Sequence, residues 1–260
     1  MSDQAESHLL SETADGVLTI TFNRPAKKNA FTLDMYDRWT DAMKAGASDP
    51  AVRVVLLRGA GGVFTAGNDL MDFMKSPPTG TDTPVFRLLE TLVGYEKPIV
   101  AAVAGPAIGI GTTMLLHCDL VYTGESAKLK MPFVDLGLCP EAGSSLLLPA
   151  MMGHQRAAAL LMLGESVSGA RAVELGLANE VLADAELDAY AANKAKILAA
   201  KAPTSVRLTK ALMKKGQAGT LESMMLEEGN HFIERLQSDE AREAFSAFFE
   251  KRKPDFSRFG

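Results

Sequence analysis

Along the first two thirds of the chain, short runs of apolar residues alternate with stretches in which apolar positions recur at helical spacing. Residues 16–23 alternate apolar and polar side chains, as a half-buried strand does. The runs at 52–57 and 98–103 are rich in Val, Ile and Leu and predict further strands. Between the first two runs, Thr32 can cap a helix that begins at Leu33. This alternation predicts an α/β fold with a parallel βαβ core.

The pattern after residue 155 is almost entirely helical. We expect helices over 155–163, 169–175, 187–200, 205–216, 220–237 and 240–253. We also expect short strands at 119–122, 129–131 and 181–182, a helix at 84–95, and a mobile Pro/Thr/Gly-rich loop at 72–84. The recurring strand, turn and helix suggest stacked turns of a spiral. The predicted organisation is a core of residues 1–200 followed by a helical region of residues 201–260.

The helical tail carries more apolar positions than a peripheral pair of helices needs for its own core. They include Leu208, Leu212, Met224, Leu226, Phe232, Phe245, Phe248 and Phe249. We therefore expect part of this tail to face another subunit.

Composition and charge argue against several classes of function. The 260 residues are 47% hydrophobic, so a sizeable core can form, and a net charge of −5 without a long basic run gives nucleic-acid binding little support. No apolar stretch is long enough to span a membrane, and residues 1–11 lack the basic head and apolar run of a signal peptide. The two cysteines do not suggest a disulfide framework. We therefore expect a cytoplasmic protein that binds neither nucleic acid nor membrane.

Two Gly-rich turns, residues 65–68 and 108–111, follow apolar strands and lead into helices. Such turns leave backbone N–H groups unpaired at a helix start, so the N–H groups of Ala66 and Ile110 could form an oxyanion hole. Either turn alone would also fit tight packing or a phosphate site. A later turn carries Glu141, which could be an acid/base or an ordinary surface carboxylate. Together the three segments suggest enolate chemistry.

The order of these segments resembles that of the crotonase (enoyl-CoA hydratase/isomerase) superfamily over nearly the whole chain. The resemblance also rests on residues 23–25, 170–178 and 247–253. It implies a crotonase-like ββα spiral core with a C-terminal α-helical trimerisation region, in a homotrimer or hexamer. The implied substrate is an acyl-CoA thioester whose oxygen is held by the N–H groups of Ala66 and Ile110. Coenzyme A is then part of the substrate, and no other cofactor or metal is expected.

The side chains must decide between the reactions of this superfamily. Its hydratases resemble one another in two glutamates that grip a water, and the matching positions here are Thr113 and Phe133. Glu141 resembles the base of the peroxisomal-type Δ3,Δ2-enoyl-CoA isomerases, which need one group to shuttle a proton. We therefore expect an enoyl-CoA isomerase. The alternatives are an enoyl-CoA hydratase or related hydrolase that uses Glu141 with a water, and a non-catalytic acyl-CoA-binding protein.

Further positions are expected to contact the substrate. The resemblance places the adenine of CoA near the backbone of Lys28 and Ala30, and it places Phe248 and Lys251 where tail residues of relatives contact CoA. The other candidates lie in the two turns and the segment that follows them: Gly67, Asn68, Asp69, Leu70, Gly109 and Phe133. Apolar residues around the loop could line an acyl tunnel or belong to the core: Leu70, Met71, Phe73, Met74 and Phe86.

Several polar residues near these segments also have a structural interpretation. Asp69 is expected to cap its helix, and Asn68 could orient Glu141 or a substrate or start the helix. His117 lies in an apolar helix and is expected to be a packing residue. Cys139 has no evident histidine partner, which argues against a nucleophilic role.

Overall fold

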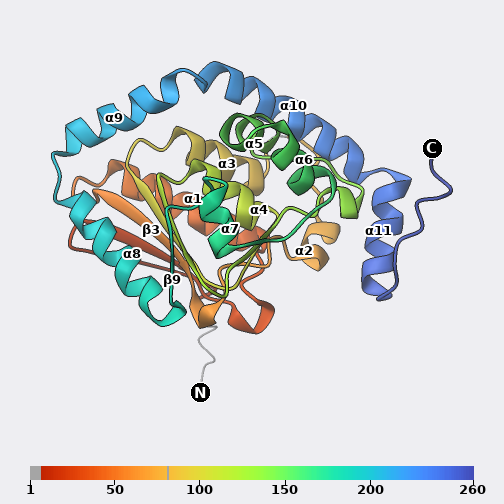
Figure 1. The fold of residues 1–260 in the computed structure, drawn as a ribbon, viewed down its shortest axis with the longest axis horizontal. Coiled ribbons are helices and arrows are strands. Elements are labelled where there is room, and N and C mark those ends of the chain that lie inside the picture. Colours follow the sequence, from red (N-terminus) through yellow and green to blue (C-terminus); the bar gives the residue numbers. More distant parts are fainter. Residues whose placement is uncertain (1–6, 81) are drawn as a thin grey trace.

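A six-stranded sheet forms the centre of the computed structural model, which describes residues 7–80 and 82–260 (Figure 1). The strand order is β1–β2–β3–β4–β6–β9, with β1 antiparallel to β2 and all other neighbours parallel. The bounds are β1 Leu9–Ala14, β2 Val17–Phe22, β3 Val54–Gly59, β4 Ile99–Val103, β6 Leu120–Gly124 and β9 Glu180–Leu182. Every residue of β4 is buried, as expected for a parallel strand covered on both faces.

A smaller sheet lies beside the first and turns the chain into a spiral. It contains β5 (Pro106–Ile108), β7 (Lys128–Lys130) and β8 (Val167–Ser168). The chain passes from β4 of the large sheet to β5 of the small one, and then from β6 to β7. An isolated bridge between Thr65 and Ala107 extends the same pattern to the segment after β3. Stacked turns of this kind are the expected ββα spiral, so the predicted fold class is confirmed.

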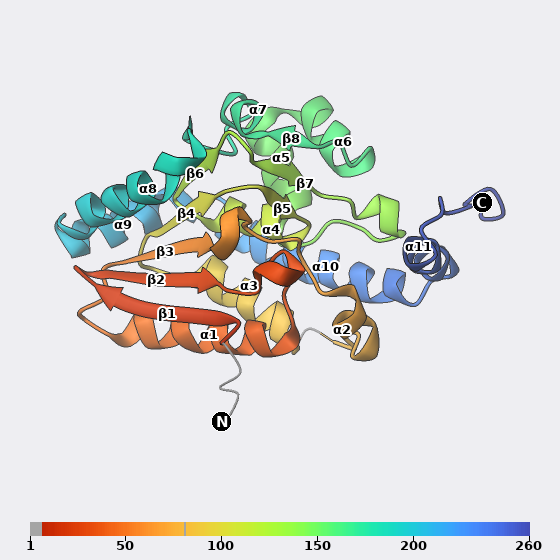
Figure 2. The same cartoon turned by 90° about the horizontal axis from the view of Figure 1, so that it is seen from below.

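Helices cover both faces of the large sheet (Figure 2). On one face, α1 (Leu33–Ser48) and α3 (Pro84–Gly94) contribute to the main core, and on the other α8 (Asp184–Ala199) closes a smaller core. Thr32 caps α1 as expected, because its side chain accepts a hydrogen bond from the N–H of Met35. The remaining helices of the spiral are α2 Leu70–Lys75, α4 Ile110–Thr113, α5 Ser144–Met152, α6 His154–Met162 and α7 Gly169–Glu174. Short 3₁₀ turns lie at Pro25–Lys27, Ala60–Gly62, Met114–His117 and Val134–Leu136.

The C-terminal helices are α9 (Pro203–Lys215), α10 (Ala218–Leu236) and α11 (Asp239–Phe249). In Figure 1, α9 and α10 arch over the spiral, and α11 lies at its far end beside the C-terminus. Phe232 and Phe245 are buried in the main core, so these two members of the expected subunit-facing stripe are instead internal. Three other members of the stripe, Leu208, Leu212 and Leu226, are well exposed on α9 and α10, and so is Met213. Met213 was absent from the expected stripe.

The structure contains elements that the sequence did not predict, and it corrects one expected loop. Strand β1 was missed because only Leu9 of its six residues is buried, so an edge strand left no apolar alternation to detect. Helix α5 was missed because the groups that cap its first turn come from α10, far along the chain. The loop expected at 72–84 is shorter, since α2 extends to Lys75; residue 81 lies outside the described residues.

Within the described residues, no helix is both long and apolar enough to cross a membrane. The first six residues of the segment tested above for a signal peptide lie outside them.

Candidate active site

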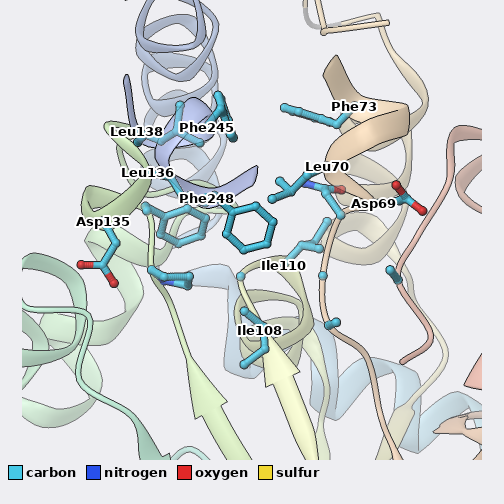
Figure 3. A pocket seen from close by; sticks show the side chains of 18 of the residues that line it. Asp69, Leu70, Phe73, Ile108, Ile110, Asp135, Leu136, Leu138, Phe245 and Phe248 are labelled. Carbon is cyan, nitrogen blue, oxygen red and sulfur yellow. The ribbon is translucent and has the colours of Figure 1, made fainter. Parts of the chain in front are cut away.

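A cavity of about 610 Å³ opens between the spiral, α2 and α11. Figure 3 shows its apolar walls: Leu70 and Phe73 from α2 on one side, Phe245 and Phe248 from α11 on the other, and Ile108 and Ile110 at the base. The two Gly-rich turns and Glu141 also line this cavity. The three segments that the sequence singled out therefore converge on one mostly apolar site.

Most of the expected substrate-contacting residues lie in this wall. They are Ala30, Ala66, Gly67, Asn68, Asp69, Leu70, Gly109, Ile110, Phe133, Glu141 and Phe248. Lys28 and Lys251 are exposed and do not line the cavity. The cations that do are Lys27, Lys130 and Arg252. Lys28 directly follows the 3₁₀ turn Pro25–Lys27, whose last residue lines the cavity, so the expected contact of its backbone with adenine stays a prediction.

The first Gly-rich turn does not present the expected donor. The N–H of Ala66 donates to the carbonyl of Lys28 at 2.9 Å, so it is already paired, and its assignment to an oxyanion hole is corrected. Gly67 follows with φ of 82°, and a Cβ there would lie 2.6 Å from the carbonyl oxygen of Ile108. Only glycine permits this close approach of the two turns. After it, the N–H of Asn68 has no acceptor among the described residues.

The side chain of Asn68 is fixed from behind. The hydroxyl of Tyr36 donates to Oδ1 of Asn68 at 2.5 Å, and this tyrosine is 1% exposed. Burial raises the pKa of Tyr36 well above its ordinary value, so the hydroxyl keeps its proton and stays a donor. The amide nitrogen of Asn68 has no acceptor in the described part of the chain, and the residue lines the cavity. Asn68 therefore offers both a backbone and a side-chain donor.

The second turn presents the donor that the sequence indicated. Ile110 is the first residue of α4, and no acceptor among residues 7–80 and 82–260 takes its N–H. The first N–H groups of a helix lack intrahelical partners, which leaves this one available to an oxygen atom in the cavity. The two available backbone donors are therefore those of Asn68 and Ile110, from two turns in contact.

Glu141 is a buried carboxyl group in this apolar wall. It is 7% exposed, its Oε1 accepts a short hydrogen bond from the hydroxyl of Thr113, and its Oε2 has no hydrogen-bond partner in the described residues. Burial raises its pKa to about 8, the hydrogen bond from Thr113 opposes this rise, and the charge of Glu228 adds to it. A carboxyl group with this pKa can both take and return a proton near neutral pH.

The turn that carries Glu141 is held from two sides. His117 is buried and its pKa is lowered to about 4, so the neutral ring donates from Nε2 to the carbonyl of Ala142 at 2.9 Å. The carboxylate of Glu228 accepts hydrogen bonds from the N–H groups of Gly143 and Ser145 at 2.6 and 2.9 Å. Ala142 itself has φ of 60°, a strained value for a residue with a Cβ. These contacts keep the carboxyl group of Glu141 in one place.

The two positions that match the pair of hydratase glutamates contain other groups. Thr113 is fully buried and serves as the donor to Glu141. Phe133 is 5% exposed and packs edge-on against Phe232, with ring centroids 6.3 Å apart. The ring of Phe133 therefore adds hydrocarbon, and no carboxylate, to the cavity wall.

The remaining polar candidates have structural roles. Asp69 caps α2 through hydrogen bonds from Met71 and Asp72, as expected, and it also pairs with Arg24 at 2.6 Å. Figure 3 shows its carboxylate turned away from the cavity. Cys139 contacts a backbone carbonyl of α10, and burial raises the pKa of its thiol to about 11, which does not favour a nucleophile. In the described residues, no three His, Cys, Asp or Glu side chains are grouped to hold a metal ion.

Sequence reasoning missed three supporting residues: Tyr36, Thr113 as a donor, and Glu228. The apolar spacing of α1 indicated that Tyr36 is buried but not that its hydroxyl reaches the first turn. The carboxylate of Glu228 accepts a hydrogen bond from the N–H of Gly143, although the two residues are 85 positions apart in the sequence. No local signal could have paired them.

Comparison with known proteins gives a consistent result. Residues 12–258 match the protein family described as Enoyl-CoA hydratase/isomerase. Enoyl-CoA delta isomerase 2 of Rattus norvegicus is 34% identical over 257 residues, which cover 96% of this chain. The matched region is 65% of that protein's length, so the chain spans about two thirds of this relative.

Similar proteins are named for more than one reaction. The 2,3-dehydroadipyl-CoA hydratase of Escherichia coli K12 is 31% identical, with 96% of this chain and 98% of that protein covered. Among solved structures, Pseudomonas aeruginosa OdaA is 49% identical with a TM-score of 0.91, and the match covers 94% of this chain and 99% of that one.

Proposed function

The chain belongs to the enoyl-CoA hydratase/isomerase family, and we propose that it moves the double bond of a 3-enoyl-CoA thioester to the 2-position. The family gives the class of substrate, and the side chains around Glu141 favour isomerisation over the addition of water. The proposal concerns both the substrate and the reaction, since relatives of similar identity carry the names of isomerases and hydratases.

The first step is polarisation of the thioester. Its carbonyl oxygen accepts hydrogen bonds from the N–H groups of Asn68 and Ile110, the two available donors of the Gly-rich turns. Negative charge on that oxygen in the enolate is then stabilised by fixed dipoles in an apolar cavity, where such donors act most strongly. The amide of Asn68, held by Tyr36, lies in the same wall and can orient the thioester.

The second step is a proton shuttle through Glu141. The ionised carboxylate removes a proton from C2, and the electron pair of that C–H bond enters a dienolate that extends to the thioester oxygen. The resulting acid returns a proton to C4, which leaves the double bond between C2 and C3 and restores the carbonyl. One acid/base group is enough, and the raised pKa of Glu141 makes it a stronger base than an exposed glutamate.

One observation supports this reaction over hydration: Glu141 is the one buried carboxyl group among the described residues that line the cavity with Asn68 and Ile110. Hydration would need a positioned water, and Thr113 and Phe133 take the two places where the pair of glutamates would hold it. A cavity without such a water also keeps the abstracted proton on the carboxyl group.

The family resemblance and the cations at the cavity mouth suggest how coenzyme A is held. Lys27 and Arg252 line the mouth and can meet phosphate groups, although Arg252 also pairs with Glu243. Ala30 lies in the wall nearby and Phe248 is 57% exposed at the opposite side, where a flat adenine ring can contact it. These contacts are part of the proposal.

Isotopic labelling tests the shuttle. A 3-enoyl-CoA with deuterium at C2 is converted in ordinary water, and mass spectrometry locates the label in the 2-enoyl product. If one shielded carboxyl group moves the proton, a measurable share of the deuterium removed from C2 appears at C4. Complete loss of that label to solvent, together with hydration of the product, would favour the hydratase alternative.

A further inference from the structure

A second cavity shares a wall with the active site. Its volume is about 1130 Å³, and it lies between α3, α5 and the arch of α9 and α10. Much of its surface is apolar, including Val93, Leu116, Leu147, Leu221 and Met225. An apolar hollow of this size beside a site for acyl thioesters has the chemistry to take a hydrocarbon chain.

Three residues line both cavities and so form the common wall: Phe86, Leu89 and Glu141. Leu89 is 1% exposed within the main core, and the turn of Glu141 is fixed by His117 and Glu228. Phe86 is half-buried and belongs to the first turn of α3. It is therefore the part of the wall that can move, or be replaced, without disturbing the core or the catalytic carboxyl group.

The ring of Phe86 rests against a glycine of α10. A Cβ at Gly229 would lie 2.7 Å from Cε1 and 3.1 Å from Cζ of that ring. The interior of a helix ordinarily favours alanine over glycine. Gly229 thus leaves the room that the phenyl ring occupies between α3 and α10.

We propose that Phe86, seated against Gly229, closes the acyl end of the active-site cavity and sets the acyl chain length that the enzyme accepts. This inference rests on the proposed function, because it places C2 to C4 of a straight-chain acyl-CoA at Glu141 and the following carbons along the wall shared with Phe86. For acyl chains that end before the ring of Phe86, the ring does not limit binding. A longer chain can continue into the second cavity only when the ring is removed.

Binding of saturated acyl-CoA thioesters tests this without relying on any reaction, since they contain no double bond to move. Calorimetry gives dissociation constants for butyryl-CoA to hexadecanoyl-CoA. Each methylene buried in an apolar cavity improves affinity about fourfold, so affinity should rise with length and then stop rising where the chain meets the ring. In Phe86→Ala the rise should continue to longer chains, tightening hexadecanoyl-CoA by about tenfold or more while butyryl-CoA changes by less than roughly twofold.

Gly229→Ala should act in the opposite direction by pushing the ring toward the acyl cavity, which weakens long-chain binding and spares butyryl-CoA. In the Phe86→Ala background the same change should have no effect, because the added methyl group then has space. Gly216→Ala is the matched control, since a Cβ at Gly216 would meet no atom within 4 Å, its φ is −67°, and it lines neither cavity. If Phe86→Ala does not fold, Phe86→Leu replaces it.

An unchanged length limit in the folded Phe86 variant, or equal effects on butyryl-CoA and hexadecanoyl-CoA, overturns the inference. Because the ligands are unreactive, the length limit can hold even if isomerisation fails. Equally, the protein can isomerise 3-enoyl-CoA even if Phe86→Ala leaves the longest acyl chain that binds unchanged. The binding experiment can therefore refute the role of Phe86 without refuting the proposed reaction, and the reverse also holds.

Discussion

Replacing Glu141 with glutamine should change how protein stability depends on pH. The pKa of this carboxyl group rises from an ordinary value of 4.5 to about 8 in the folded protein. Between those two pH values the folded state holds a proton that the unfolded state has lost. The free energy of unfolding therefore falls as pH rises through this window and is level above it.

The size of this effect follows from the pKa difference. One pKa unit corresponds to about 1.4 kcal/mol, so the full loss for a group shifted from 4.5 to about 8 is about 5 kcal/mol. Glu141→Gln has no proton to lose, and its amide can still accept from Thr113. The free energy of unfolding of the variant minus that of wild type should therefore rise by several kcal/mol from pH 5 to pH 8, because only wild type loses stability over this range.

Urea denaturation at matched protein concentration, repeated from pH 5 to pH 9, measures this difference directly. Comparison with the variant removes the contributions of other groups that titrate in both proteins. Parallel stability curves for the two proteins would refute the assignment of a buried, protonated Glu141. The same variant should lose about a hundredfold or more in turnover, since the acid/base group is gone.

The remaining predictions concern the donors, the pH profile and assembly. In wild type, kcat/KM should rise with pH as Glu141 ionises, with a midpoint near pH 8. Thr113→Val should move that midpoint upward by roughly one unit, because the ionised carboxylate loses a hydrogen-bond donor. An unchanged midpoint contradicts the contact between Thr113 and Glu141. Ile110→Pro removes one N–H at a helix position that tolerates proline and should lower kcat by about a hundredfold or more, with folding checked by circular dichroism; full activity in a folded variant excludes that donor. Light scattering should give a trimer or hexamer, because Leu212 and Met213 of α9 are 61% and 71% exposed. A monomer at micromolar concentration contradicts this, and Leu212→Glu should weaken the assembly.

The sequence predicted the spiral and the convergence of its three segments because both follow from local signals. Apolar runs identify β3 and β4, and the glycines after them mark the turns where backbone groups become available. Glu141 was identified by its motif, and its 7% exposure excludes the alternative of an ordinary surface carboxylate.

The donor of the first turn was misplaced by two residues, because which N–H is available depends on a segment distant in the sequence, the turn that ends at Lys28. Ala66 and Asn68 both belong to the turn, but the carbonyl of Lys28 reaches only the first. Tyr36 lies 32 positions before Asn68, which it supports, and Glu228 lies 85 and 83 positions after Gly143 and Ser145, whose N–H groups it accepts hydrogen bonds from. Such contacts are decided by tertiary packing, which periodicity and turn signals do not encode.

Two rates from one preparation distinguish proton transfer by Glu141 from the addition of water. Purified protein receives 3-hexenoyl-CoA in one reaction and 2-hexenoyl-CoA in another, and the products are separated and identified by mass. We expect kcat/KM for isomerisation to exceed that for hydration by about a hundredfold or more, because the described site contains no second carboxyl group to hold and activate water. Hydration of 2-hexenoyl-CoA that equals or exceeds isomerisation of 3-hexenoyl-CoA would contradict it.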